Sequence, residues 1–143
     1  MTPLILTDSY TATSTNTNLN GDTISNSNSD ESAVYITSSG ITISSSTITK
    51  SGDSSNTENS EFYGVNAAIL VNGGGLTMTG SNINTSGKGA NAIVATNSGT
   101  VTILGTTITS TGSSSAMGLH ATYGGTITAT NVVISSTGGL VPL

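Results

Sequence analysis

Carboxylates are the side chains in this sequence that come closest to forming a chemical site, and all of them precede residue 62. Paired carboxylates can hydrolyse a glycosidic bond, and clustered ones can bind calcium. The spacing of Asp30-Glu31, or of Asp53, Glu58 and Glu61, matches no calcium loop. We therefore interpret these acids as solvated, with weak calcium binding as the alternative. The seven carboxylates are Asp8, Asp22, Asp30, Glu31, Asp53, Glu58 and Glu61.

The other reactive groups are two lysines and one histidine. A Ser-His-Asp triad needs an acid to orient its histidine, but no acid follows Glu61, and His120 stands in a predicted strand with no nucleophile-elbow sequence near it. Lys50 and Lys88 each lie beside a turn glycine, and no cysteine or second histidine is available to bind zinc. We therefore predict no catalytic residue, no metal and no cofactor, and a protein that is not an enzyme.

Charge is distributed unevenly along the 143 residues, whose net charge is −5. Seven carboxylates against Lys50 give six net negative charges in the first part, whereas no acid follows Glu61. Nucleic acid is excluded as a partner because no cluster of Lys or Arg can neutralise phosphates. No segment approaches the roughly 20 apolar residues that cross a bilayer, so we predict no membrane insertion. A surface rich in Ser, Thr and Asn is commoner outside cells, which predicts an extracellular or cell-surface location.

The elements that must position these side chains are predicted to be β-strands. Ile, Val and Thr favour strands, and the chain repeats with a period near 25 residues. Residues 99–112 align with 125–138 at an offset of 26, and residues 75–87 and 40–52 carry the same pattern. Two or three short strands per repeat, separated by Gly, Asn and Ser, leave no room for a helix. This period predicts a coil that climbs one strand spacing per repeat.

Alternation within the strands assigns inward and outward faces. We predict three inward aliphatic ladders with one residue per coil, and an outward column of threonines between two of them. The ladders are Ile41, Leu76, Val101 and Ile127; Ile43, Met78, Ile103 and Ala129; and Ile48, Ile83, Ile108 and Ile134; the outward column is Thr42, Thr77, Thr102 and Thr128.

One interval in the repeat is longer than the others and reveals an insertion of about ten residues near 53–63. We expect a protruding loop there, and loops on rigid scaffolds often carry function. The insertion ends in Phe62 and Tyr63. We interpret both rings as folding back over the outer face of the second strand, formed by Val34, Ile69 and Val94; a role in recognition is the alternative.

Residues 61–68, 89–93 and 120–127 carry a resemblance to a known family. The stretch from about 32 to 139 resembles bacterial right-handed parallel β-helix proteins, which have a pectate-lyase-like fold and occur as secreted or surface adhesin-like repeat proteins. The resemblance implies an all-β, right-handed parallel β-helix (solenoid) of about four to five coils with one loop insertion near 53–63. Length favours a single β-helix domain over 1–143, with 1–16 and 139–143 as candidate capping or assembly termini.

Three functions remain open. The first is a non-enzymatic structural or adhesive module that associates with itself end to end into filaments, or laterally, because a solenoid leaves unpaired backbone groups at both ends. The second is ice binding through outward Thr pairs, although Ser44 and Leu104 interrupt the second position. The third is binding of a surface glycan through Tyr63, His120 and Tyr123. The candidate surface residues are Thr42, Thr77, Thr79, Thr102, Thr128, Thr130, Phe62, Tyr63, His120 and Tyr123.

Overall fold

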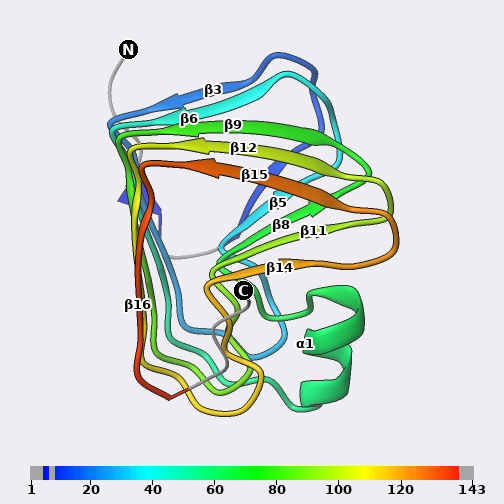
Figure 1. Ribbon diagram of the computed structural model, residues 1–143, viewed down its shortest axis with the longest axis vertical. Coiled ribbons are helices and arrows are strands. Elements are labelled where there is room, and N and C mark those ends of the chain that lie inside the picture. Colours follow the sequence, from blue (N-terminus) through cyan, green and yellow to red (C-terminus); the bar gives the residue numbers. More distant parts are fainter. Residues whose placement is uncertain (1–4, 7–8, 139–143) are drawn as a thin grey trace.

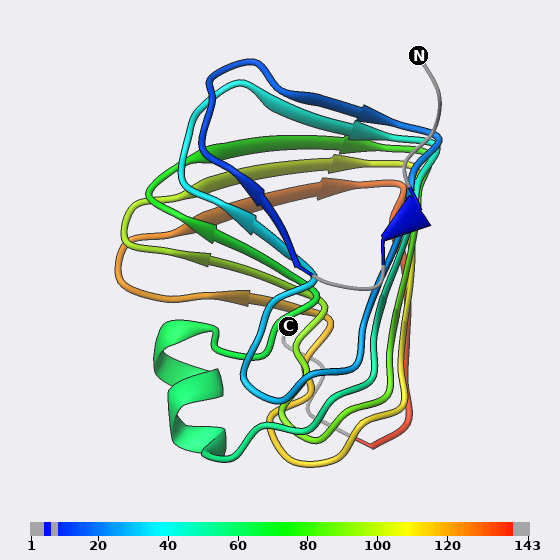
Figure 2. The ribbon, with the colours of Figure 1, turned by 180° about the vertical axis from the view of Figure 1, so that it is seen from behind.

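The computed structural model describes residues 5–6 and 9–138, which form an all-β parallel solenoid of about five coils (Figures 1 and 2). Each complete coil contributes one strand to each of three parallel sheets, here called sheets A, B and C. Sheet A has the order β1 (Ile5–Leu6), β4 (Thr23–Asn26), β7 (Thr47–Lys50), β10 (Asn82–Thr85), β13 (Thr107–Ser110) and β16 (Val133–Ser136). Sheet B has the order β14 (Leu119–Ala121), β11 (Ile93–Thr96), β8 (Ile69–Asn72), β5 (Val34–Ile36) and β2 (Tyr10–Ala12). Sheet C has the order β15 (Thr126–Thr130), β12 (Thr100–Leu104), β9 (Gly75–Thr79), β6 (Ile41–Ser44) and β3 (Asn18–Asn20).

The register of the strands confirms the predicted aliphatic ladders. Ile83 pairs with Ile48 on one side and with Ile108 on the other, and the two ladders of sheet C are equally in register. Leu19 and Ile24 extend the stack by one coil toward the N-terminus. Because each buried aliphatic side chain contributes about 1.5 to 3 kcal/mol, this shared core holds the coils together. All three ladders lie in one continuous hydrophobic core, except for Ala129 in the last coil, which is exposed.

Glycines form a further ladder, at the corner that follows sheet A. A Cβ atom added at Gly87 would lie 2.0 Å from the carbonyl oxygen of Gly52, and one at Gly112 would lie 2.1 Å from that of Gly87. Backbones of successive coils therefore approach more closely here than any side chain permits. Gly138 continues the ladder, and Asn28 takes the corresponding position in the preceding coil.

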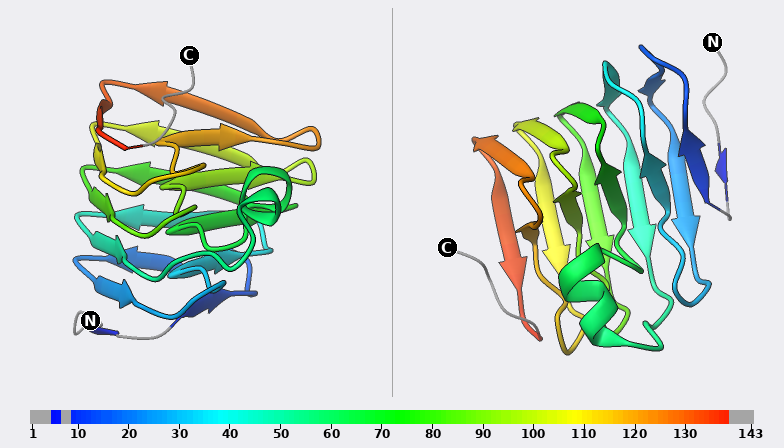
Figure 3. Two further views of the ribbon diagram at one scale, coloured as in Figure 1. Left: turned by 90° about the horizontal axis from the view of Figure 1, so that it is seen from below. Right: turned by 90° about the vertical axis from the view of Figure 1, so that its right-hand side faces the viewer.

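The insertion lies where the sequence predicted it, between β7 and β8, but the expectation of a protruding loop without a helix was wrong. It forms a short helix, α1 (Thr57–Tyr63), which lies outside the coil (Figure 3). The Asn56 side chain accepts hydrogen bonds from the backbone N–H groups of Glu58 and Asn59, and Gly64 ends the helix in the left-handed conformation with φ 73°. Both are standard helix-ending signals. The extra residues can be helical because they take no part in the coil.

The predicted faces of sheet B need one correction. Val34 and Ile69 point inward and belong to the main core, whereas Val94 points outward, as predicted. Ile69 pairs with Ile93 rather than with Val94, and a shift of one residue turns a side chain to the opposite face. The outward column across sheet B is Thr11, Tyr35, Leu70, Val94 and His120.

A polar layer lies beneath α1 and joins it to the coil. Asn66 and Asn91 are fully buried, and their amide nitrogens donate to the carbonyl oxygens of Gly52 at 2.7 Å and of Ser60 at 3.1 Å. Buried amides are stabilising only when they are paired in this way. The second of these bonds ties α1 to the next coil. The predicted capping role of residues 139–143 falls outside the described residues.

Candidate functional site

Three aromatic side chains are exposed together beside α1. Phe62 is 49 % exposed, Tyr63 56 % and Tyr123 59 %, and the three line one shallow pocket. The whole chain has one Phe, four Tyr and no Trp, so most of its aromatic side chains are placed here rather than in the core. Exposed clusters of large apolar groups mark interaction sites. This aromatic cluster is therefore a candidate binding site.

Tyr63 and Tyr123 stack on each other across 60 positions of sequence. Their ring centroids are 5.8 Å apart and the ring planes differ by 11°, an offset parallel arrangement that aromatic pairs favour. Tyr63 is the last residue of α1, and Tyr123 lies in the turn after β14 with a φ of 44°. A hydrogen bond with the Tyr63 side chain raises the pKa of the Tyr123 hydroxyl above its ordinary value, so this phenol stays protonated at neutral pH.

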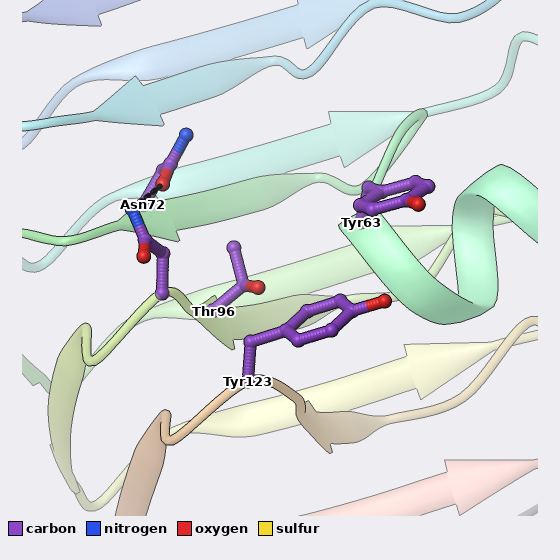
Figure 4. A pocket seen from close by; sticks show the side chains of 5 residues that line it. Tyr63, Asn72, Thr96 and Tyr123 are labelled. Atoms are coloured by element: carbon purple, nitrogen blue, oxygen red, sulfur yellow. Dashed lines mark hydrogen bonds between the residues drawn. The ribbon is translucent and has the colours of Figure 1, made fainter.

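Side-chain amides adjoin the tyrosine pair and provide polar contacts. Tyr63 and Tyr123 line a pocket of about 450 Å³ together with Asn72, Thr96 and Asn97 (Figure 4). The Asn97 amide nitrogen donates to Asn72 Oδ1 at 3.3 Å, and the Asn72 amide nitrogen donates to the Tyr35 hydroxyl at 2.9 Å. Asn72 and Thr96 are direct partners in adjacent strands. The pocket therefore combines aromatic rings with a row of donors and acceptors.

Two further pockets adjoin this one, and Tyr63 lines all three. One, of about 340 Å³, is formed with Glu58, Asn59, Phe62 and Tyr123. The other, of about 510 Å³, extends over the outer face of sheet B. We call the three together the aromatic groove. Its third pocket is lined by Ser9, Thr11, Asp30, Glu31, Ser32, Tyr35, Tyr63, Val65, Leu70 and Asn72.

The position of Tyr63 depends on how α1 is attached. His120 Nε2 lies 2.5 Å from the Glu61 carbonyl oxygen, which requires the tautomer or cation that carries a proton on Nε2. The Ser115 hydroxyl donates to the Glu61 carboxylate. A Cβ atom at Gly64 would lie 2.6 Å from Leu70 Cδ1 and 2.7 Å from Val94 Cγ1. The end of α1 thus packs on the outer patch of sheet B through backbone. The prediction that the Phe62 and Tyr63 rings cover Val34 and Ile69 was wrong, because both of these side chains point inward, and each ring is about half exposed.

The structure distributes the predicted surface residues over two separate faces. Thr42, Thr77, Thr102 and Thr128 are exposed and in register on sheet C, as predicted. In the second column, Leu104 is 41 % exposed and lies between Thr79 and Thr130. His120 is half-buried under α1 and holds the helix; it does not line the three pockets described above.

The carboxylates that raised the question of calcium bind backbone and hydroxyl groups. Asp30 accepts from the Ser55 backbone N–H at 2.9 Å and from the Ser55 hydroxyl at 2.6 Å, and these two bonds lower its pKa. Asp53 accepts from the Lys88 backbone N–H at 2.8 Å. Within residues 5–6 and 9–138, no group of three or more His, Asp or Glu side chains could hold a metal ion.

Sequence reasoning did not find Tyr35, Asn72, Thr96 and Asn97 as site residues. A signal was present, because Asn72 and Thr96 end the second strand of successive coils as direct partners, and Asn97 follows Thr96 by one residue. Polar residues at the same position of successive coils form a row on the surface of a solenoid.

Comparison with protein-family models, with curated proteins and with solved structures gave no match for this chain. In the part of the chain that the structure describes, no helix has the length and apolar character needed to span a membrane.

Proposed function

We propose that this protein is a non-enzymatic adhesive module that binds a surface glycan through the aromatic groove. The observation that carries the proposal is the exposed Tyr63–Tyr123 pair beside the amides of Asn72 and Asn97. Aromatic faces present apolar area next to a polar hydroxyl, and side-chain amides both donate and accept hydrogen bonds. Sugar rings offer the complementary combination of C–H faces and hydroxyl edges.

The state of one groove carboxylate, Asp30, supports binding rather than cleavage. Glycoside hydrolysis needs one carboxyl group that holds a proton at working pH. Hydrogen bonds with Ser55 lower the pKa of Asp30, which lines the third pocket of the groove. Asp30 therefore stays ionised and is unsuited to act as a general acid.

Glycan binding is tested by screening the purified chain on a glycan array and titrating the hits by calorimetry. We expect Tyr63→Ala and Tyr123→Ala to weaken binding at least tenfold, because each removes one ring of the stacked pair. The control is Val133→Ala, which alters a side chain that is 64 % exposed on sheet A, away from the groove. An array without hits, or binding that survives both tyrosine substitutions, would contradict the proposal.

A second candidate function, end-to-end self-association, is favoured by the ends of the described sheets. β14, β15 and β16 are the terminal strands of sheets B, C and A at one end, and β2, β3 and β1 at the other. A second copy stacked in the same orientation would continue the parallel pairing that each sheet already uses. Ile127 and Ile134 in the last coil are only half-buried, so stacking would also bury apolar surface.

Self-association is tested by sedimentation at several concentrations together with negative-stain microscopy. Rods or species that grow with concentration support stacking, and a monomer that does not change with concentration contradicts it. The relation to right-handed, pectate-lyase-like proteins of bacteria and the extracellular location also remain predictions, and they rest on the sequence motifs and composition.

A further inference from the structure

We propose that the aromatic groove binds an extended glycan that runs across the coils, parallel to the solenoid axis, and that this glycan is uncharged or carries amines rather than acidic groups. The inference rests on the proposed glycan binding and adds the length, direction and charge of the ligand.

The length follows from which coils contribute to the groove. Tyr123 follows β14, Asn97 follows β11, Asn72 ends β8, Tyr35 lies in β5 and Thr11 lies in β2. These are the five strands of sheet B, in their spatial order. Strands in a sheet lie about 4.8 Å apart, so four spacings give a groove of roughly 19 Å. A single sugar would occupy one part of this length, whereas an oligosaccharide would occupy all of it.

The lining favours a hydroxyl-rich chain along the whole groove. Hydrogen bonds already connect Asn97 to Asn72 and Asn72 to Tyr35, so three successive coils present polar groups in one line. The tyrosine stack lies at one end of this line. A proline-rich peptide also docks on aromatic grooves, but its proline rings need apolar side chains along the whole groove. In the middle of this groove the structure places amides and a hydroxyl.

The charge follows from the carboxylates along the groove and from the position of the two lysines. Asp30 and Glu31 line the third pocket, and Glu58 lines the second. Lys50 is fully buried, donates to Asn26 Oδ1 at 3.1 Å and interacts electrostatically with Glu31 and Asp30, so it offsets one of the three negative charges. Lys88 does not line the three pockets. The groove therefore carries a negative potential that attracts amines and repels acids. One like charge at about 4 Å in water weakens binding roughly fivefold.

The test compares four probes on the full chain at low salt: N-acetylglucosamine, the β-1,4-linked hexamer of N-acetylglucosamine, the fully deacetylated hexamer, and a hexamer of galacturonic acid. We expect both glucosamine-based hexamers to bind at least tenfold more tightly than the monomer. We expect the deacetylated hexamer to bind about fivefold more tightly than the acetylated one, and the acidic hexamer to bind most weakly of the three. High salt should remove the difference between the two glucosamine-based hexamers.

A pair of charge-neutralising variants makes the test specific. Glu31→Gln should reduce the preference for the deacetylated hexamer, because two of the three groove carboxylates remain, and should leave the affinity for the acetylated hexamer unchanged. Asp53→Asn removes the same charge from a carboxylate that does not line the three pockets, and it should leave the preference intact.

The other outcomes distinguish a failure of this inference from a failure of the proposed glycan binding. Equal affinity for monomer and hexamers, or a preference for the acidic hexamer, overturns the inference and leaves glycan binding standing. Absence of binding to every array glycan and to all four probes overturns the proposed function itself. Binding of a proline-rich peptide in place of glycans, lost in Tyr123→Ala, would reassign the groove to peptide recognition and overturn both.

Discussion

The backbone of Gly87 lies so close to that of Gly52 that an added methyl group would come within 2.0 Å of the Gly52 carbonyl oxygen. The contact joins two successive coils at the corner after sheet A. The same approach recurs from Gly112 to Gly87 and from Gly138 to Gly112. Register at this corner is therefore fixed by main-chain contact, in addition to the aliphatic side chains of the core.

The Gly87 contact predicts that Gly87→Ala destabilises the protein more than a glycine substitution at an open turn. Gly87 has no positive φ, so its cost comes from the collision with Gly52. Gly80 has a φ of 53° and nothing within 4 Å of an added Cβ, so Gly80→Ala should cost only about 1 kcal/mol of backbone strain. Urea unfolding of both variants compares the two effects. Equal losses of unfolding free energy would show that the coils separate easily at this corner.

The central aliphatic ladder predicts a large loss of stability in Ile83→Ala. Ile83 is fully buried between Ile48 and Ile108, and such a truncation leaves a cavity that costs about 2 to 5 kcal/mol. The matched control is Asn84→Ala, an outward position on the same strand, which should change the free energy of unfolding by less than about 0.5 kcal/mol. Thermal and urea unfolding measure both. Similar losses in the two variants would contradict the assignment of faces.

The stack of coils could be predicted from the sequence because the same physical requirement returns in every repeat. An inward position such as Ile48, Ile83 or Ile108 must be aliphatic each time, and the repetition makes the signal readable. The Tyr63–Tyr123 contact appears once and joins an inserted segment to a turn 60 residues away. Nothing in the local pattern around either tyrosine encodes that contact.

The helix could have been predicted from its ends, but the repeat argued against it. Asn56 and Gly64 are suited to begin and end a helix. The prediction that the repeat leaves no room for a helix was correct for the coil. It was wrong for the insertion, which is not part of the repeat.

His120 is predicted to act as a positioning residue for Tyr63. Its ring nitrogen contacts the Glu61 carbonyl oxygen at 2.5 Å, so His120→Ala should loosen α1 without unfolding the coil. Hydrogen exchange should speed up in α1 and stay unchanged in β10 and β13. Any glycan affinity should fall, and His120→Gln, which retains an N–H donor, should restore part of it. Uniform exchange changes across the whole chain would instead indicate a role in global stability.

Lys50 predicts a pH dependence of stability. Burial is the main cause that lowers its pKa below the ordinary 10.5, and Glu31, Asp30 and Asp53 oppose this shift. Between the lowered folded pKa and 10.5, the unfolded chain binds more protons than the folded one. The free energy of unfolding should therefore rise as pH increases through that window. Urea unfolding at a series of pH values should show this rise, and Lys50→Met should remove it. Lys88→Met, which alters an exposed lysine, should retain it.

The interrupted threonine array predicts weak or absent ice binding. Leu104 replaces threonine in the second column of sheet C, and an ordered hydroxyl array needs that column complete. We expect no freezing-point gap in a thermal-hysteresis measurement of the natural sequence. A gap that increases in Leu104→Thr would overturn this expectation and restore ice binding as a function of sheet C.

The segment from 53 to 64 leaves the coil and returns to it without changing the pairing of β7 with β10 or of β5 with β8. The solenoid therefore tolerates extra residues at this corner, because the strands on either side of the insertion keep their pairing with the neighbouring coils. Such a corner lets a new recognition surface arise by lengthening one excursion while the supporting framework stays the same. The exposed surface of this segment can then vary without a change in the fold of the coil.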